Sequence, residues 1–233
     1  MIASLDHLTL GGSAAVYETL LGRRAHDGRL RTGNVGLAFT SGAPGLQSMV
    51  FATADPDKAA TLLERRAVAT KRAGDALALD AHGVAIGLAA KASEAPSSFT
   101  ADEESCVSAL DHVVVRTPNP ERAIAFYAGR LGLDLRLDRS NPQWGARLLF
   151  FRCGDLVVEI AHDLKKGVSD APDQLWGLSW RVPDVAKAQA RLKAYGLDVT
   201  EPRDGRRPGS RVFSVKDRTE GVPTLIIGGI GRW

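Results

Sequence analysis

One stretch, residues 109–163, constrains the fold most, because it has the pattern of a strand, a helix and three further strands. A β-branched run at 110–116 meets Pro118 and Pro120, which lack an N–H and so end the strand and start a helix. Apolar residues then recur at helical spacing until Gly132. Three strands are predicted after it, the last two joined by the tight turn Gly154-Asp155. The pattern predicts one βαβββ module.

The module recurs along the chain. Leu5-Asp6-His7 repeats Leu110-Asp111-His112, and the spacing of strand and helix patterns predicts four βαβββ modules, the first in shortened form. Residues 91–108 are rich in Ser, Ala and acidic residues and have no hydrophobic period. We therefore expect an α+β fold of two tandem domains, residues 1–92 and 108–233, joined by a linker, residues 93–107. The halves should be separable at this linker, where a protease should cut first.

The motif at residues 110–132 and the ending at 154–163 resemble the vicinal oxygen chelate superfamily, which includes glyoxalase I, bleomycin- and fosfomycin-resistance proteins and extradiol dioxygenases. The resemblance covers the second half of the chain well and the first half loosely. It implies that modules pair so that their curved sheets form a cup that holds the ligand. It also implies that His112, in the first strand of its module, and Glu159, in the fourth, are metal ligands.

Strand geometry supports this pair. Successive residues point to opposite faces of a strand, and a two-residue turn at 154–155 places Phe150 beside Glu159 on one face. Imidazole and carboxylate suit one divalent ion of zinc, iron, nickel or manganese. Two alternatives need no metal: His112 is a buried, hydrogen-bonded side chain, and Glu159 is paired with Arg152 or Arg181.

The resemblance also implies a second ligand pair from the partner module, but these positions hold Gly177 and Leu225. Two protein ligands rarely hold a metal firmly. The first domain is poorer still, since it has His7 but Ser48 and Gly87 at ligand positions. We expect the first domain to be structural or a degenerate ligand cup.

An anion-binding cup is the other chemical interpretation. Arg152 and Arg181 are expected to share the cup face with Ser179 and Phe150, with Trp144 or Trp180 adding flat apolar surface. Because Arg binds carboxylates in a bidentate manner, the set suits a small aromatic or enolate-like molecule with a carboxylate.

Composition excludes other classes of partner. The net charge is +3 and the pI is about 9.0. The basic residues are scattered except in one loop, which contains Arg203, Arg206, Arg207 and Arg211. Because no aromatic residues interleave with these arginines, a solvated loop or an anion contact is favoured over nucleic-acid binding. No apolar run could span a bilayer and no leader pattern is present, so we expect a cytoplasmic protein. The sequence leaves open whether the protein forms a homo-oligomer.

Three functions follow. The first is a metal-dependent lyase, isomerase or dioxygenase that uses His112 and Glu159, with Glu159 as a base in one version. The second is a metal-free protein that binds a small molecule in the second cup. The third is a non-catalytic scaffold. The lack of ligand side chains at Gly177 and Leu225 favours the second and third functions. It argues against ring cleavage in particular, because the resemblance maps the ligand set of extradiol dioxygenases to His112, Gly177 and Leu225.

Overall fold

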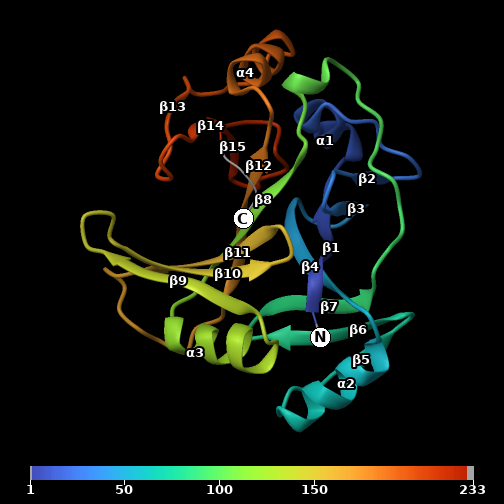
Figure 1. Cartoon of the computed structure of the whole chain (residues 1–233), viewed down its shortest axis with the longest axis vertical. Helices are drawn as coiled ribbons and strands as arrows, with labels where there is room; N and C mark the ends of the chain where they lie inside the picture. Colours follow the sequence, from blue (N-terminus) through green and yellow to red (C-terminus); the bar gives the residue numbers. More distant parts are fainter. Residues whose placement is uncertain (1, 230–233) are drawn as a thin grey trace.

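The computed structural model describes residues 2–229, which form two curved mixed sheets, one from each half of the chain (Figure 1). The first sheet has the order β2-β3-β1-β4-β7-β6-β5, and its elements are β1 (Ile2–Gly11), α1 (Ala14–Leu21), β2 (Arg29–Arg31), β3 (Gly36–Thr40), β4 (Gly45–Thr53), α2 (Pro56–Arg65), β5 (Lys71–Ala73), β6 (Ala76–Ala81) and β7 (Val84–Ala90).

The second sheet has eight strands in the order β13-β14-β15-β12-β8-β11-β10-β9. Its half of the chain contains β8 (Ala109–Arg116), α3 (Pro120–Ile124), the π-helical turn η2 (Ala125–Arg130), β9 (Asp134–Asn141), β10 (Ala146–Cys153), β11 (Leu156–Asp163), β12 (Gln174–Arg181), α4 (Val185–Ala194), β13 (Arg203–Asp204), β14 (Arg211–Val215) and β15 (Thr224–Gly228).

Each sheet joins two modules along an antiparallel pair of first strands, β1 with β4 and β8 with β12. The predicted α+β fold of paired modules is therefore confirmed. The first module is shortened as expected, since β1 is followed only by α1, β2 and β3. In the last module the sequence predicts a strand near Val199–Glu201, but β13 begins at Arg203 and Val199 makes only an isolated bridge to Val215.

Local chemistry sets the ends of the helices as the sequence predicts. Ser13 accepts a hydrogen bond from the Ala15 amide at the start of α1, and Gly22 ends that helix with φ of 67°. Asn119 caps α3 in the same way. Gly132, with φ of 77°, ends the following π-helical turn. A left-handed backbone at these two glycines is one that residues with a Cβ rarely adopt.

The second sheet curls strongly. If the eight strands lay flat, the β9–β10 turn and the β13–β14 loop would be about 30 Å apart, because neighbouring strands are spaced by about 4.8 Å. Instead, the guanidinium of Arg206 in the loop stacks 4.3 Å from the centre of the Trp144 ring in the turn. The sheet therefore closes far enough for its two ends to touch, as the predicted cup requires.

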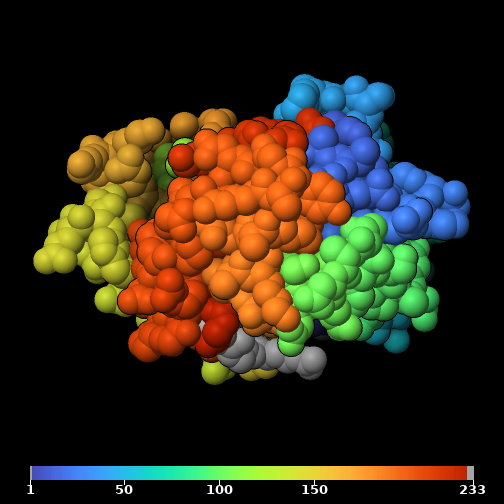
Figure 2. Space-filling view, turned by 90° about the horizontal axis from the view of Figure 1, so that it is seen from above, coloured from blue at the N-terminus to red at the C-terminus, as the bar shows by residue number. Residues whose placement is uncertain are grey.

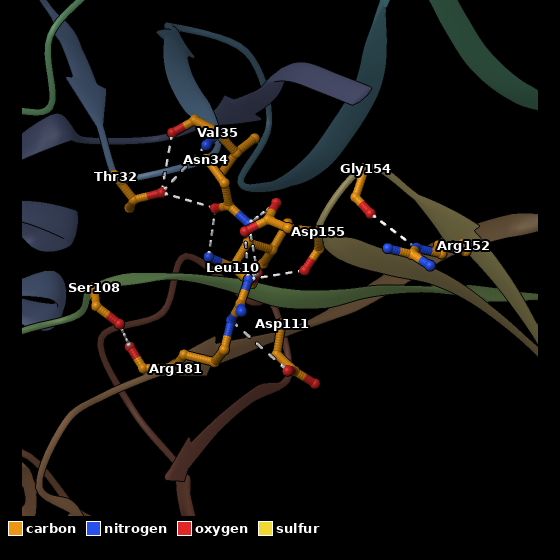
Figure 3. A network of polar contacts seen from close by, with 10 residues as sticks. All are labelled: Thr32, Asn34, Val35, Ser108, Leu110, Asp111, Arg152, Gly154, Asp155 and Arg181. Carbon is orange, nitrogen blue, oxygen red and sulfur yellow. Dashed lines mark hydrogen bonds and ion pairs between the residues drawn. The ribbon is translucent and has the colours of Figure 1, made fainter. Parts of the chain in front are cut away.

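The two halves are packed together. One cluster of buried apolar side chains includes Leu5 and Leu21 from the first half and Leu110 from the second. At the junction, Asn34 exchanges two hydrogen bonds of 2.8 Å with the backbone of Leu110 and also donates to Asp155 (Figure 3). Arg191 of α4 donates to the Thr19 and Leu20 carbonyls at the end of α1.

The connecting segment is bound to the first half for part of its length. Residues 93–96 are exposed, whereas the Ser97 amide donates to Arg31 and the Thr100 amide to Gly22. Because residues 93–107 lack apolar periodicity, the sequence predicts that little of this segment is buried, but at its end Cys106 and Val107 are buried. Atoms of this segment (green) lie against both the first half (blue) and α4 (orange) in Figure 2. Over residues 2–229, no helix is long and apolar enough to cross a membrane.

Candidate functional site

His112 and Glu159 lie together on the face predicted from strand parity. Strand β11 runs parallel to β8 with Val157 opposite His112, so that Glu159 follows one pleat further along. The Nε2 atom of His112 is 3.5 Å from Oε2 of Glu159. Their side chains keep 15% and 13% of their accessible surface, so both are largely shielded yet reachable from solvent. The hairpin register is also as predicted, with Phe150 opposite Glu159 and Arg152 opposite Val157.

Asp111, which the sequence interpretation did not single out, orients the imidazole. Its Oδ2 is 2.9 Å from Nδ1 of His112, which leaves Nε2 directed at Glu159. Burial disfavours a charged imidazole, but the hydrogen bond to Asp111 and the charge of Glu159 outweigh it and raise the pKa of His112. A carboxylate on the far ring nitrogen is also the arrangement that orients metal-binding histidines. The adjacent Asp and His in the sequence were the available signal.

Ser179 lies on the neighbouring strand directly opposite His112. It is 1% exposed, and within the described part of the chain its Oγ has no hydrogen-bond partner. A buried hydroxyl without a partner is costly, so this oxygen is a candidate contact for a molecule bound beside His112.

The arginines expected on the cup face take other positions. Arg181 is buried and donates to the Leu110 carbonyl at 2.9 Å and to Asp155 at 3.1 Å, which ties it to the junction of the halves rather than to Glu159 (Figure 3). Arg152 is exposed and donates to the Gly154 carbonyl. Neither makes an ion pair with Glu159, whose ion-pair partner within residues 2–229 is His112.

The second ligand pair is absent, and the backbone explains one half of it. A Cβ at Gly177 would come within 2.8 Å of the Pro223 carbonyl oxygen, so a histidine could not be placed there without moving that strand. Leu225 pairs with Ser179 at the carboxylate position of β15. No group of three or more His, Cys, Asp or Glu side chains that could hold a metal occurs between residues 2 and 229. His112 and Glu159 therefore fit a divalent ion only with further oxygens from water or a bound molecule.

The first sheet repeats part of this site. The Nδ1 atom of His7 is 2.9 Å from Oδ2 of Asp6, as in the second sheet. Ala38 occupies the place of Glu159, because His7 is opposite Gly36 and Thr9 is opposite Ala38. Beside His7 lies a cavity of about 20 Å³, the size of one water molecule. The expected ligand positions Ser48 and Gly87 are on β4 and β7, with Val50 opposite Gly87.

Sequence interpretation also missed two stacked groups at the edge of the second cup. Arg116 lies 4.1 Å from the centre of the Trp176 ring. Arg139 and Arg206 lie 4.9 and 4.3 Å from the centre of Trp144. The basic loop around Arg206 was visible in the sequence, but its aromatic partner is more than 60 residues away in the chain and only the curled sheet brings the two together.

Known proteins match about half of the chain. The chain is 27% identical over 109 residues to an ethylmalonyl-CoA/methylmalonyl-CoA epimerase of Cereibacter sphaeroides, covering 42% of this chain and 81% of that protein. It is 25% identical over 122 residues to a lactoylglutathione lyase of Salmonella typhimurium, covering 51% of this chain and 90% of that protein.

Solved structures match the whole arrangement. BphC, a halotolerant catechol dioxygenase, covers 100% of this chain and 89% of its own with a TM-score of 0.77 at 14% identity. The match to the Mn(II)-bound glyoxalase from Novosphingobium aromaticivorans covers 99% of this chain and 83% of that protein, with a TM-score of 0.73 at 12% identity. At such identities the likeness concerns the fold. Residues 109–223 match the family described as the Glyoxalase/Bleomycin resistance protein/Dioxygenase superfamily, and this part of the chain belongs to that superfamily.

Proposed function

We propose that the second sheet binds a small, oxygen-bearing organic molecule at His112 and Glu159, and that Glu159 acts on it as a base. The observation that supports this is the 3.5 Å approach of the two side chains, both largely shielded, on one face of a curled sheet. Phe150 beside Glu159 adds apolar surface, and the unpartnered Ser179 hydroxyl adds a hydrogen-bonding group. Apolar surface with a few polar groups is typical of small-molecule sites.

The chemistry follows from the two side chains. A carboxylate shielded from water can remove a proton from the carbon next to a carbonyl group, and a protonated imidazole beside it can donate to the oxygen on which charge develops. Asp111 holds the imidazole in place for this role. A divalent ion held by His112, Glu159 and oxygens of the ligand would polarise the same carbonyl. The named activities of the relatives, an epimerase and a lyase, are compatible with such a proton transfer.

A second candidate is a metal-free binding protein without turnover. Gly177 and Leu225 support it, because they leave the partner module without imidazole or carboxylate at the two positions where the family resemblance implies them. In this case, Glu159 and His112 recognise the ligand and do not transform it.

One experiment separates the candidates. The protein, purified without added metal, is analysed for bound zinc, iron, nickel and manganese. It is then incubated in D₂O with methylmalonyl-CoA or lactoylglutathione, and deuterium uptake at carbon is followed by NMR. Base catalysis predicts uptake that Glu159→Gln reduces by at least about 100-fold, whereas Glu201→Gln, at an exposed carboxylate 78% accessible to solvent, leaves it unchanged. Ligand-induced stabilisation without uptake supports the binding protein, and the absence of both contradicts the proposal.

A further inference from the structure

Two tryptophans and three arginines form a rim along one edge of the second sheet. This arginine–tryptophan rim consists of Arg116, Arg139, Trp144, Trp176 and Arg206. All five side chains are exposed, and Trp144 and Trp176 keep 39% and 37% of their accessible surface. Stacking on a ring holds a guanidinium plane in a defined orientation while its N–H groups stay free to donate.

The arginines of the rim lack acidic partners. Among residues 2–229, none of the three guanidinium groups makes a hydrogen bond or ion pair with another side chain or with the backbone. Arg147 on β10 shows the usual alternative, since Asp138 and Glu121 both bind it at 2.6 Å. Three unpaired positive charges at one edge produce a local field that attracts anions.

The rim lies on the same face as the candidate site. Arg139 is opposite Leu148, Leu148 is opposite Ala161 and Ala161 is opposite Arg116, so that these residues form one row across four strands. Glu159 precedes Ala161 by two residues, which places the row one pleat repeat, about 7 Å, from the carboxylate. Arg116 and Arg139 are three strand spacings apart, about 14 Å along the curled sheet. A small molecule bound at Glu159 would therefore extend over the rim.

We propose that the arginine–tryptophan rim binds the anionic group of the ligand, a phosphate or a carboxylate, while the reacting part lies at His112 and Glu159. The inference rests on the proposed function for the position of the reacting part, but not for the binding of the anion. Planar guanidinium groups bind both phosphate and carboxylate in a bidentate manner, and the tryptophan faces offer surface to the apolar portion between the two ends.

The test uses tryptophan fluorescence, because two of the four tryptophans belong to the rim. The full chain is titrated with pyrophosphate and separately with succinate, each at constant ionic strength maintained with sodium chloride. Saturable binding of one probe is expected, and a preference identifies the anion class. The variants Arg116→Ala, Arg139→Ala and Arg206→Ala should each weaken it at least tenfold. Arg136→Ala is the matched control, since this exposed arginine of the same strand as Arg139 is already paired with Asp134 at 2.9 Å.

The outcomes are decisive in both directions. Absence of saturable binding of both probes, or equal weakening by Arg136→Ala and Arg139→Ala, would overturn the rim as an anion site. The Glu159→Gln protein separates this inference from the proposed function, because it should bind the probe at least as tightly as the unchanged protein, since a nearby negative charge is removed. Anion binding without any deuterium uptake would support the rim while contradicting base catalysis, and uptake without anion binding would do the reverse.

Discussion

The two sheets carry the same Asp–His pair with different surroundings, and the difference shows which part of the motif belongs to the fold. Asp6 and His7 are joined at 2.9 Å, as are Asp111 and His112. In the first sheet, however, the neighbouring strand has Ala38 where the second has Glu159. The Asp–His pair therefore also occurs in a sheet that has no further carboxylate beside the imidazole. Chemistry at the second pair depends on the added carboxylate.

The aspartates also differ in what holds them. The Asp6 carboxylate accepts a 2.9 Å hydrogen bond from the Ala92 amide, where the chain leaves the first sheet. Asp111 is 1% exposed and has the Arg181 Nε 3.8 Å from its Oδ1. The second pair is therefore coupled through Arg181 to the junction of the two halves, where Asp155 and Asn34 lie.

Loss of Arg181 should have the largest effect. Arg181→Ala removes a buried cation beside Asp111 and breaks the ion pair with Asp155. Breaking a buried charge pair costs about 3–5 kcal/mol, and since Asp155 is 38% exposed we expect a loss of about 2–3 kcal/mol in the free energy of unfolding. Arg152→Ala, at an exposed arginine, should stay within about 0.5 kcal/mol. Urea unfolding measures both, and equal effects would contradict the role given to Arg181.

A side chain at Gly177 should come next. Gly177→Ala places a Cβ within 2.8 Å of the Pro223 carbonyl oxygen, so we expect a loss of about 1–3 kcal/mol as the strands shift. Gly129→Ala is the control, because a Cβ there meets no atom within 4 Å and alanine favours a helix. Unfolding midpoints that are unchanged in Gly177→Ala would show that this position can accept a Cβ after all.

The charge of Glu159 should appear in the titration of His112. The raised pKa means that protonated His112 adds stability at low pH, which is lost as the pH rises through the pKa of the folded protein. Glu159→Gln removes one source of the shift, so the pKa of His112 should fall and the protein should gain less stability on acidification. Imidazole NMR signals report this directly, with the other four histidines as internal references. An unchanged His112 titration would mean that the charge of Glu159 does not contribute to its raised pKa.

Cleavage of the connecting segment should have the smallest effect. Glutamyl endopeptidase should cut after Glu94, in the exposed part of the segment, before it cuts after Glu103 or Glu104 in the short helical turn. The halves should then stay associated, because Asn34 and Arg191 link them. Gel filtration of the nicked protein tests this, and separation of two folded fragments would contradict it and support halves that are separable at the linker.

Part of the site was predictable from local rules. Strand parity and a two-residue turn were enough to place Phe150 beside Glu159, and the repeated Leu-Asp-His motif was enough to identify the modules. The partner of Arg181 was not predictable. A long side chain binds whichever carboxylate or carbonyl the tertiary fold places within reach, and here that is Asp155 at the junction.

The sequence by itself determined the order of the modules, the faces of their strands and the adjacency of Phe150 and Glu159, because a period of two and a short turn act over a few residues. The pairing of His112 with Glu159 was implied by the family resemblance. Only the tertiary structure decided that the second sheet curls until Arg206 reaches Trp144, that Pro223 closes the space at Gly177, and that Ser179 is buried without a partner. These features depend on how strands distant in the chain twist and pack together, and no local pattern of residues specifies that.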